Sequence, residues 1–460
     1  FKQKTAYEIP KRDWSSDVCS SDLRLTFADG VAAGETLIVL DSRGEDARGA
    51  ARALAAGTVA SAAVMLMTED AHVLNWFPSI TLAGTAVTMA AGVGVNWSLL
   101  SIGSGMLVGL RINLSMLLGL ALGFIVAPYA LLHYGVLPPQ FTRNDVLLWG
   151  MWPGTGLLIA GGLTSLALKW DVLARTFSNL STRNTDPNGV PLSWVAIGSA
   201  VAAVALIAIQ RINFGLDIWI AATAVLLSLP LMLVGLRVVG ETNWGPISQL
   251  SNTMQAIFGV LAPGHLAANM LASGTTGTIA VESEAIMQDY KVGHMLGSSP
   301  RHLTIMQLLA TPVGAAAVSW MYPLLRTTYG IVGEHAELTS PISRRWAGFA
   351  EIMARGFGAL PPGALAAMLV AALVGVALAV MESRGIRLAP SPTGLGIGMM
   401  VPAAVVLVMC VGGLIETAWK KVSPSTHERL VAPLASGFIA GEALVAVVIP
   451  LLVVLGLMRM

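Results

Sequence analysis

One stretch of the chain is dense in polar side chains yet contains no charged residue between Glu241 and Glu282. Helix-breaking residues interrupt it at Gly245-Pro246, Gly259, Pro263-Gly264, Gly274 and Gly277. Backbone that is broken at membrane depth is tolerated only where it is buried in protein or lines a water-filled cavity. Discontinuous helices of this kind form substrate and ion sites in secondary transporters. We therefore predict a substrate pathway with these polar candidates: Glu241, Asn243, Gln249, Asn252, Gln255, Asn269, Thr275 and Thr276.

A second interpretation of the same stretch stays open. Two ordinary helices could be joined by a Pro263-Gly264 turn, with the hydroxyl groups bonded to their own backbone. One apolar stripe at helical spacing supports it, formed by Ile247, Leu250, Met254, Ile257 and Phe258. The rest of that helix carries Gln249, Asn252 and Gln255, which lipid would not readily accept.

Carboxylates within or beside apolar runs are the next candidates for chemistry. A charge at the centre of a bilayer costs about 3 kcal/mol or more, so such residues are rare without a function. Glu442 lies inside the last apolar run, and Glu241 flanks another. A carboxyl group that ionises only when a cavity opens to water could carry a coupling proton. The alternative for both residues is a carboxyl group bonded to nearby backbone.

The elements that must position these residues are long apolar segments. Nine stretches lack Asp, Glu, Lys and Arg, and a tenth, 430–458, contains only Glu442; the nine are 71–110, 112–142, 146–168, 187–210, 218–236, 242–281, 302–325, 356–381 and 388–415. A spanning helix needs about 20 apolar residues, and no ten-residue alternation typical of a barrel is present. We predict an all-α, polytopic helical membrane protein with ten to twelve spanning or half-spanning helices, some of them discontinuous.

The composition of the 460 residues agrees with a chain embedded in a lipid bilayer. Hydrophobic residues make up 55% and charged residues only 12%, against about 25% charged in soluble domains. The net charge of +1 offers no basic face for nucleic acid. Two cysteines and seven histidines show neither a disulfide framework nor metal-ligand spacing. No phosphate-binding loop, metalloprotease motif or nucleophile elbow occurs, so we predict no catalytic residue, metal or cofactor.

The first 23 residues differ from the rest. They carry four basic and four acidic side chains and lack the apolar core of a signal peptide. They resemble the translation of a sequencing adaptor, and we interpret them as non-native; a native cytosolic tail is the alternative. Residues 24–460 then form the membrane domain.

Six stretches form a series of motifs along the chain. They are LTFADGVAAGETL (25–37), SLLSIGSGMLVGLRINLSMLLG (98–119), GETNWGPISQLSNTMQAIFG (240–259), DYKVGHMLGSSPRHLTIMQLLATPVGA (289–315), SPTGLGIGMMVPAAVVLVMCVGGLIE (391–416) and SGFIAGEALVAV (436–447). In these stretches and their order, the chain resembles the oligopeptide transporter superfamily, which includes peptide carriers and yellow-stripe-like carriers of metal chelates. The first stretch matches a family motif at Leu25, Phe27, Gly30, Ala32 and Glu35, whereas Ala28 replaces its usual proline.

The resemblance implies proton-coupled import of oligopeptides or peptide-like metal chelates, here across a bacterial inner (plasma) membrane. It implies further helices before Arg24, so we expect a chain truncated at its N-terminus. Glu35 joins Glu442 and Glu241 as a candidate for proton coupling. The family commonly has Asn-Pro where Gly245-Pro246 stands.

A basic connector follows the central polar stretch, and we expect it to be a cytosolic loop with Asp289, Lys291 and Arg301. Two other classes of function stay open: an intramembrane enzyme or assembly factor, and a passive channel.

Overall fold

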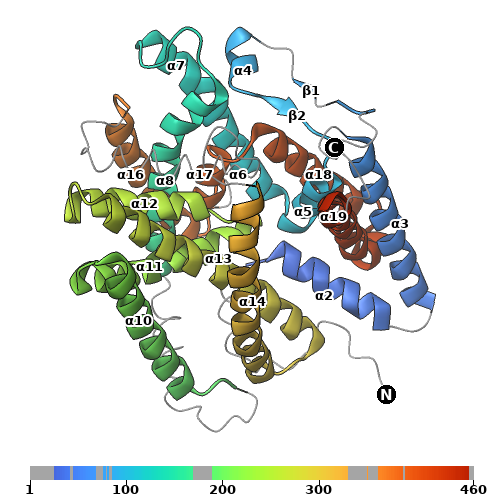
Figure 1. Ribbon diagram of the computed structural model, residues 1–460. Helices are drawn as coiled ribbons and strands as arrows, with labels where there is room; N and C mark the ends of the chain where they lie inside the picture. Colours follow the sequence, from blue (N-terminus) through green and yellow to red (C-terminus); the bar gives the residue numbers. More distant parts are fainter. Residues whose placement is uncertain are drawn as a thin grey trace.

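The computed structural model describes residues 25–41, 45–68, 76–78, 80–81, 85–168, 189–329, 350, 361–386 and 389–454. The segment 1–23, which we interpret as non-native, lies outside the described residues. The described part is almost entirely helical (Figure 1). Its two strands, β1 (Ile80–Thr81) and β2 (Gly94–Val95), pair antiparallel over two residues each. The prediction of an all-α fold is confirmed.

Nine candidate membrane spans occur in this described part, judged by length and apolar composition. They are supplied by α3 (Glu45–Met67), the continuous run α6 (Leu110–Leu120), η3 (Ala121–Val126) and α7 (Ala127–His133), then α8 (Arg143–Leu168), α10 (Leu192–Phe214), α11 (Ile218–Thr242), α14 (Pro300–Tyr329), α16 (Ala364–Ser383), α18 (Ala403–Val422) and α19 (Pro424–Val454). Shorter or more polar helices complete the bundle: α2 (Ala28–Asp41), α4 (Ala86–Ala90), α5 (Leu99–Val108), α12 (Ile247–Leu261), α13 (Leu266–Leu296) and α17 (Pro392–Gly398). The protein is therefore a polytopic membrane protein.

The two largest apolar cores hold the described part of the bundle together. The larger one joins α5 to α8 with α17 and α18, and includes Phe124, Met116 and Ile397. The second joins α11, α12 and α13 around Met254 and Phe258. At the edges, α16 packs on α8 and α3 packs along α19. Residues far apart in sequence thus surround the same interior.

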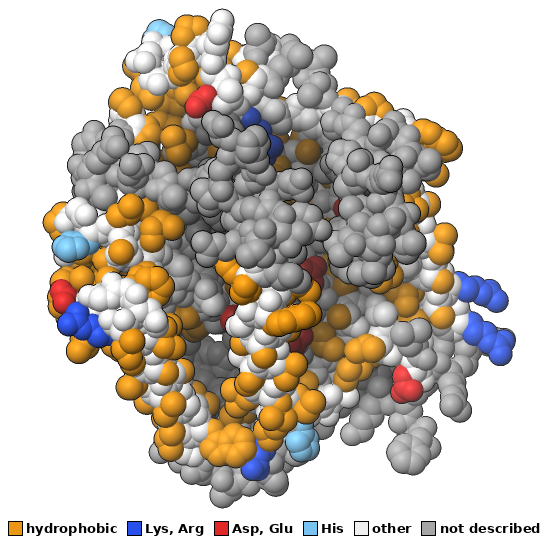
Figure 2. All heavy atoms as spheres, in the orientation of Figure 1, with side chains coloured by type: hydrophobic (Ala, Val, Ile, Leu, Met, Phe, Trp, Pro, Cys, Tyr) orange, Lys and Arg blue, Asp and Glu red, His pale blue; other side chains and the backbone are white. Residues whose placement is uncertain are grey.

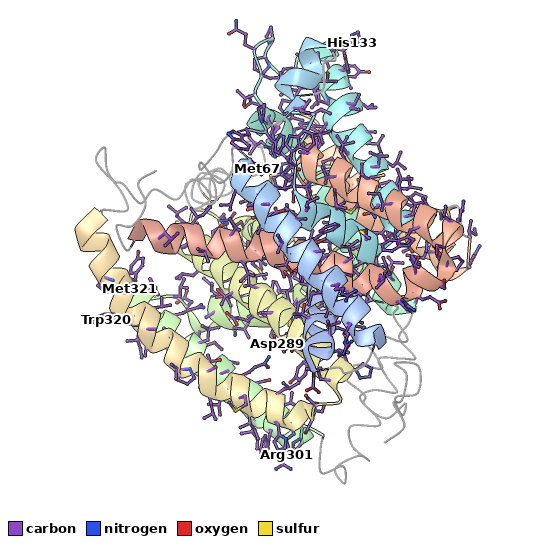
Figure 3. All side chains as sticks on the ribbon, turned by 90° about the vertical axis from the view of Figure 1, so that its right-hand side faces the viewer. Met67, His133, Asp289, Arg301, Trp320 and Met321 are labelled. Atoms are coloured by element: carbon purple, nitrogen blue, oxygen red, sulfur yellow. The ribbon has the colours of Figure 1, made fainter. Side chains whose placement is uncertain are left out.

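Two long helices lie on the outside of this arrangement. Almost none of the apolar segment of α10 or of α14 is buried in the protein, and hydrophobic side chains cover both (Figure 2). From Arg301 to Met321, α14 runs along the outer edge of the bundle (Figure 3). Such apolar surfaces are suited to contact with lipid or further helices.

Among the breaks between consecutive helices, three lie at Gly109, at Asn243 and at Met399–Pro402. Gly109 separates α5 from α6 with φ +91°, a value that side chains rarely permit. Asn243 ends α11 in the left-handed conformation, four residues before α12 begins. The third break divides α17 from α18 at Met399–Pro402. The break between Asn243 and Ile247 coincides with the one predicted at Gly245-Pro246.

Several predicted breaks and one predicted loop are absent from the described helices. Gly274 and Gly277 lie inside the uninterrupted α13, and Gly259 lies inside α12. Asp289 and Lys291 lie on α13, and Arg301 lies in the first turn of α14. The expected loop is therefore only a short connection at Gly297–Ser299. Glycine costs a helix only about 1 kcal/mol, which packing against neighbouring helices readily offsets.

Candidate functional site

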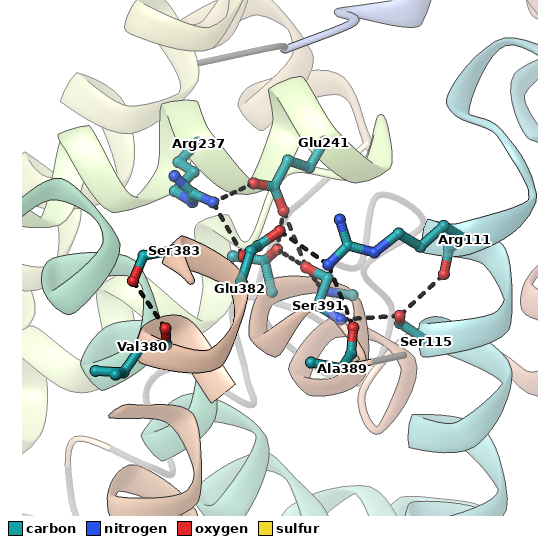
Figure 4. Close-up of polar contacts among 11 residues, drawn as sticks. Arg111, Ser115, Arg237, Glu241, Val380, Glu382, Ser383, Ala389 and Ser391 are labelled. Carbon is teal, nitrogen blue, oxygen red and sulfur yellow. Dashed lines mark hydrogen bonds and ion pairs between the residues drawn. The ribbon is translucent and has the colours of Figure 1, made fainter. Parts of the chain in front are cut away.

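A charged cluster with a buried centre and a partly exposed edge lies where four helices meet. On α11, Arg237 and Glu241 are four residues apart, a spacing that puts both on one face of the helix. Arg237 Nη2 lies 2.6 Å from Glu241 Oε1, and less than a tenth of either side chain is exposed. This ion pair is the centre of what we call the charged cluster: Arg111, Arg237, Glu241, Glu382, Ser391 and Thr393 (Figure 4).

The other members come from distant parts of the chain. Glu382, near the end of α16, lies 3.6 Å from Arg237 and 3.3 Å from Arg111 of α6. Ser391 Oγ, at the start of α17, donates a hydrogen bond of 3.0 Å to Glu241 Oε2, and the Thr393 hydroxyl donates to the same oxygen. The cluster therefore ties together α6, α11, α16 and α17.

The charges of the cluster sum to zero, but burial of its central ion pair costs desolvation energy. Two guanidinium groups face two carboxylates, so the formal charge of the cluster is zero. Removing ions from water costs several kcal/mol each, and the ion pair recovers this only with good geometry. Within the described residues, Nε and Nη1 of Arg237 have no hydrogen-bond partner. Such a cluster can exchange partners when neighbouring helices move or when a polar solute enters.

A second polar region lies between α12 and α13. Asn269 Nδ2 donates to the Gln255 carbonyl at 2.6 Å, and both residues are almost fully buried. Further along α13, Gln210 of α10 donates to Thr275, and the Thr276 hydroxyl lies 2.9 Å from that of Ser228. Four buried oxygens of this interface have no partner among the described residues: Ser251 Oγ, Asn252 Oδ1, Asn269 Oδ1 and Ser273 Oγ.

Each of the two interpretations of this stretch accounts for some of these contacts. Thr253, Thr275 and Thr276 bond to carbonyls one turn earlier, as two ordinary helices require. The amide oxygens of Asn252 and Asn269 accept no hydrogen bond from the described part of the chain. Unpartnered buried oxygens are uncommon and favour bound water or a polar solute. The hairpin of α12 and α13 therefore contains both hydroxyl groups bonded to their own backbone and amide oxygens without a partner.

The predicted pathway residues do not form a single group. Glu241 belongs to the charged cluster, whereas Asn243 bonds to Asp29 at 2.7 Å and to Ser104 at 3.3 Å. Gln249 contributes its carbonyl to Thr253. The pathway candidates are thus divided between the charged cluster, the start of α2 and the α12–α13 hairpin.

The three predicted proton carriers differ in their environments. Glu241 is held by an arginine and two hydroxyl groups. Glu442 accepts 2.9 Å hydrogen bonds from the Ser98 hydroxyl and from Leu100 N, at the start of α5. It therefore acts as a cap on that helix, which corresponds to the bonded alternative. Glu35 is half-buried on α2.

Glu442→Gln is expected to lower the free energy of unfolding by about 1 kcal/mol while leaving proton dependence of uptake intact. The amide oxygen can still accept one bond, but the negative charge that favours a helix N-terminus is lost. Thermal unfolding in detergent measures the first effect, and uptake at several pH values measures the second. Loss of pH dependence without loss of stability would instead show that Glu442 carries the coupling proton.

An apolar cavity of about 480 Å³ lies elsewhere, between α8, α12 and α16. Its lining includes Trp152, Ile257 and Met368, and it shares no residue with the charged cluster. Within the described residues, no three His, Cys, Asp or Glu side chains converge as metal ligands would.

Sequence reasoning missed several buried polar residues. Arg237 could have been found from its position four residues before Glu241. Glu284 also escaped notice, although it lies just beyond the polar stretch. Arg111, Glu382, Ser391 and Thr393 gave no local signal, because their partners lie on other helices.

Comparison with known proteins gives consistent matches. The family model described as OPT oligopeptide transporter protein matches residues 21–453. A Saccharomyces cerevisiae protein, described provisionally as an oligopeptide transporter, is 24% identical over 417 residues, covering 75% of this chain and 57% of the relative. A metal-nicotianamine transporter of Arabidopsis thaliana is 23% identical over 403 residues, covering 76% and 58%. The chain thus spans somewhat more than half the length of these relatives.

Proposed function

The chain belongs to the OPT oligopeptide transporter family, and from this premise we propose that it carries small peptides or peptide-like metal chelates across a membrane by secondary, proton-coupled transport. The membrane we propose is a bacterial inner membrane. The observation that carries the proposal is the pair of polar regions buried among apolar helices. Intramembrane ionisable groups are costly and are kept where a pathway needs them.

The geometry supports a polar, zwitterionic substrate. The charged cluster presents both signs of charge and has no net formal charge. The α12–α13 hairpin adds neutral oxygens and lies next to the helix break before Ile247. A peptide or a chelate carries amino and carboxylate groups together, so it needs acceptors and donors of this kind. The relatives are described as oligopeptide and metal-nicotianamine transporters, which favours the same class.

Reconstitution into liposomes tests this proposal. We expect saturable uptake of a labelled tripeptide or of a metal-nicotianamine chelate, and we expect uptake to rise when the outside is made more acidic than the inside. Liposomes without protein and an excess of unlabelled substrate are the controls. Saturable uptake that ignores the pH gradient would remove proton coupling. Flux that never saturates would instead indicate a channel.

A further inference from the structure

Glu284 is a buried carboxyl group that neither polar region uses. It lies on α13, and only 8% of its surface is exposed. Its side chain reaches the break between α11 and α12, where a Cβ atom placed on Gly245 would lie 2.1 Å from Glu284 Oε2. A Cβ atom on Gly235 of α11 would lie 3.3 Å from Oε1. Two glycines therefore leave the space that this carboxyl group occupies.

The carboxyl group of Glu284 is less restrained than the other central glutamates. Its Oε1 atom has no hydrogen-bond partner among the described residues. By contrast, Glu241 has an arginine and two hydroxyl groups, and Glu442 has a hydroxyl and a backbone N–H. An ionised carboxylate buried without partners is costly, whereas its protonated form is tolerated more easily. The site therefore favours a carboxyl group that changes its protonation when the surroundings change.

No described charged group on the neighbouring helices forms an ion pair with Glu284. On α11, Arg237 and Glu241 pair with each other. No residue of α12 is acidic, basic or histidine. The remaining titratable groups of the described parts of these helices are Asp29, Glu35 and Asp41 of α2, Arg301, His302 and Tyr322 of α14, Asp217 before α11, and Glu282, Asp289, Tyr290, Lys291 and His294 of α13 itself.

Of these groups, Asp29 bonds to Asn243, Asp289 accepts from Gln307, and Arg301 stacks on Trp194. The α2 helix meets α13 near Gln288, Lys291 and Met295, beginning one turn beyond Glu284. No described cation forms an ion pair with Glu284.

We propose that Glu284 binds and releases the coupling proton, an inference that rests on the transport proposed above. When the α11–α12 break faces the acidic side, the carboxylate takes up a proton and becomes a neutral acid that the buried site tolerates. When the break opens to the other side, water solvates the carboxylate and the proton leaves. The same helix carries Asn269 and Thr276 of the hairpin, so substrate and proton act on one rigid element.

The substitution Glu284→Gln tests this role, because it imitates the protonated form. Two assays on the same liposomes are needed: exchange of labelled for unlabelled substrate at equal pH, and accumulation driven by a pH gradient. We expect Glu284→Gln to keep exchange and to lose gradient-driven accumulation. The matched control is Glu282→Gln, an exposed residue two positions away on α13, which should keep both.

Each other outcome has a definite meaning. Wild-type protein that shows no exchange would refute the proposed transport rather than the role of Glu284. If Glu284→Gln accumulates substrate under a pH gradient as well as the wild-type protein does, the proposed role of Glu284 is overturned. Loss of both exchange and accumulation in a folded Glu284→Gln would also overturn it, since the residue would then be needed for substrate.

A second variant keeps the test available if Glu284→Gln fails to fold. Glu284→Asp retains a carboxyl group but withdraws it from the glycine-lined space. We expect it to keep driven accumulation and to shift the pH at which uptake is half-maximal. An unchanged pH profile in Glu284→Asp would overturn the proposal.

Discussion

Arg237→Leu is expected to lower the free energy of unfolding by about 3–5 kcal/mol, because it leaves Glu241 as a buried carboxylate without its ion-pair partner. Hydroxyl groups of Ser391 and Thr393 remain, but they supply no compensating charge. The loss should appear as a large fall in the midpoint of thermal unfolding in detergent. Uptake should fall with it, since four helices meet at this cluster.

A double substitution separates the cost of the unpaired charge from the value of the pair. Arg237→Leu combined with Glu241→Leu removes both charges and should be more stable than Arg237→Leu alone. The control is Arg211→Leu, which breaks an exposed pair of 3.6 Å with Asp217. Exposed pairs contribute about 0–1 kcal/mol. Equal effects of Arg237→Leu and Arg211→Leu would show that the charged cluster is not energetically distinct.

Gly398→Ala is expected to destabilise the protein by about 1–3 kcal/mol through overpacking, although alanine is the better helix former. A Cβ atom on Gly398 of α17 would lie 2.1 Å from the Met116 carbonyl oxygen of α6. The reciprocal contact is equally close, because a Cβ atom on Gly119 would lie 2.1 Å from the Leu395 carbonyl. The contacted atom belongs to the backbone of α6, which cannot shift as the end of a flexible side chain can. Helix α17 would therefore have to move away from α6.

The consequence should extend to transport, because α17 begins at the residues that bond Glu241. Thermal unfolding and uptake measured on Gly398→Ala and Gly119→Ala should both decline. The control is Gly198→Ala on the outer helix α10, where an added Cβ atom meets nothing within 4 Å. If all three variants unfold at the same temperature, the close approach of α6 and α17 is not required.

Much of the fold could be predicted from apolar stretches. The spans α8, α10, α11, α14, α16, α18 and α19 lie within or across predicted charge-free runs. The break at Gly245-Pro246 was also predictable, because proline lacks the N–H group that continues a helix. The sequence did not predict that Asp289 and Lys291 are helical. Their charges favoured a loop, but α13 packs against α11, α12 and α2 and continues through both residues.

The candidate site was only partly predictable, and Glu241 illustrates why. Its position beside an apolar run was visible in the sequence, but one of its hydroxyl partners, Ser391, lies 150 residues away. Glu442 is similar, because its partner Ser98 is 344 residues distant. No feature of the sequence distinguishes Glu284 from Glu282. In the structure, Glu284 is buried and Glu282 is exposed.

The sequence by itself determined that this is a helical membrane protein with polar, broken segments, because length and hydrophobicity are local properties that lipid selects directly. Only the tertiary structure decided that Glu241 is paired with an arginine and that Glu284 Oε1 has no partner among the described residues. That distinction depends on distances of a few ångströms between helices far apart in the chain, and on the energy of charge in a medium without water. Paired and unpaired glutamates therefore look alike in sequence and differ in the fold.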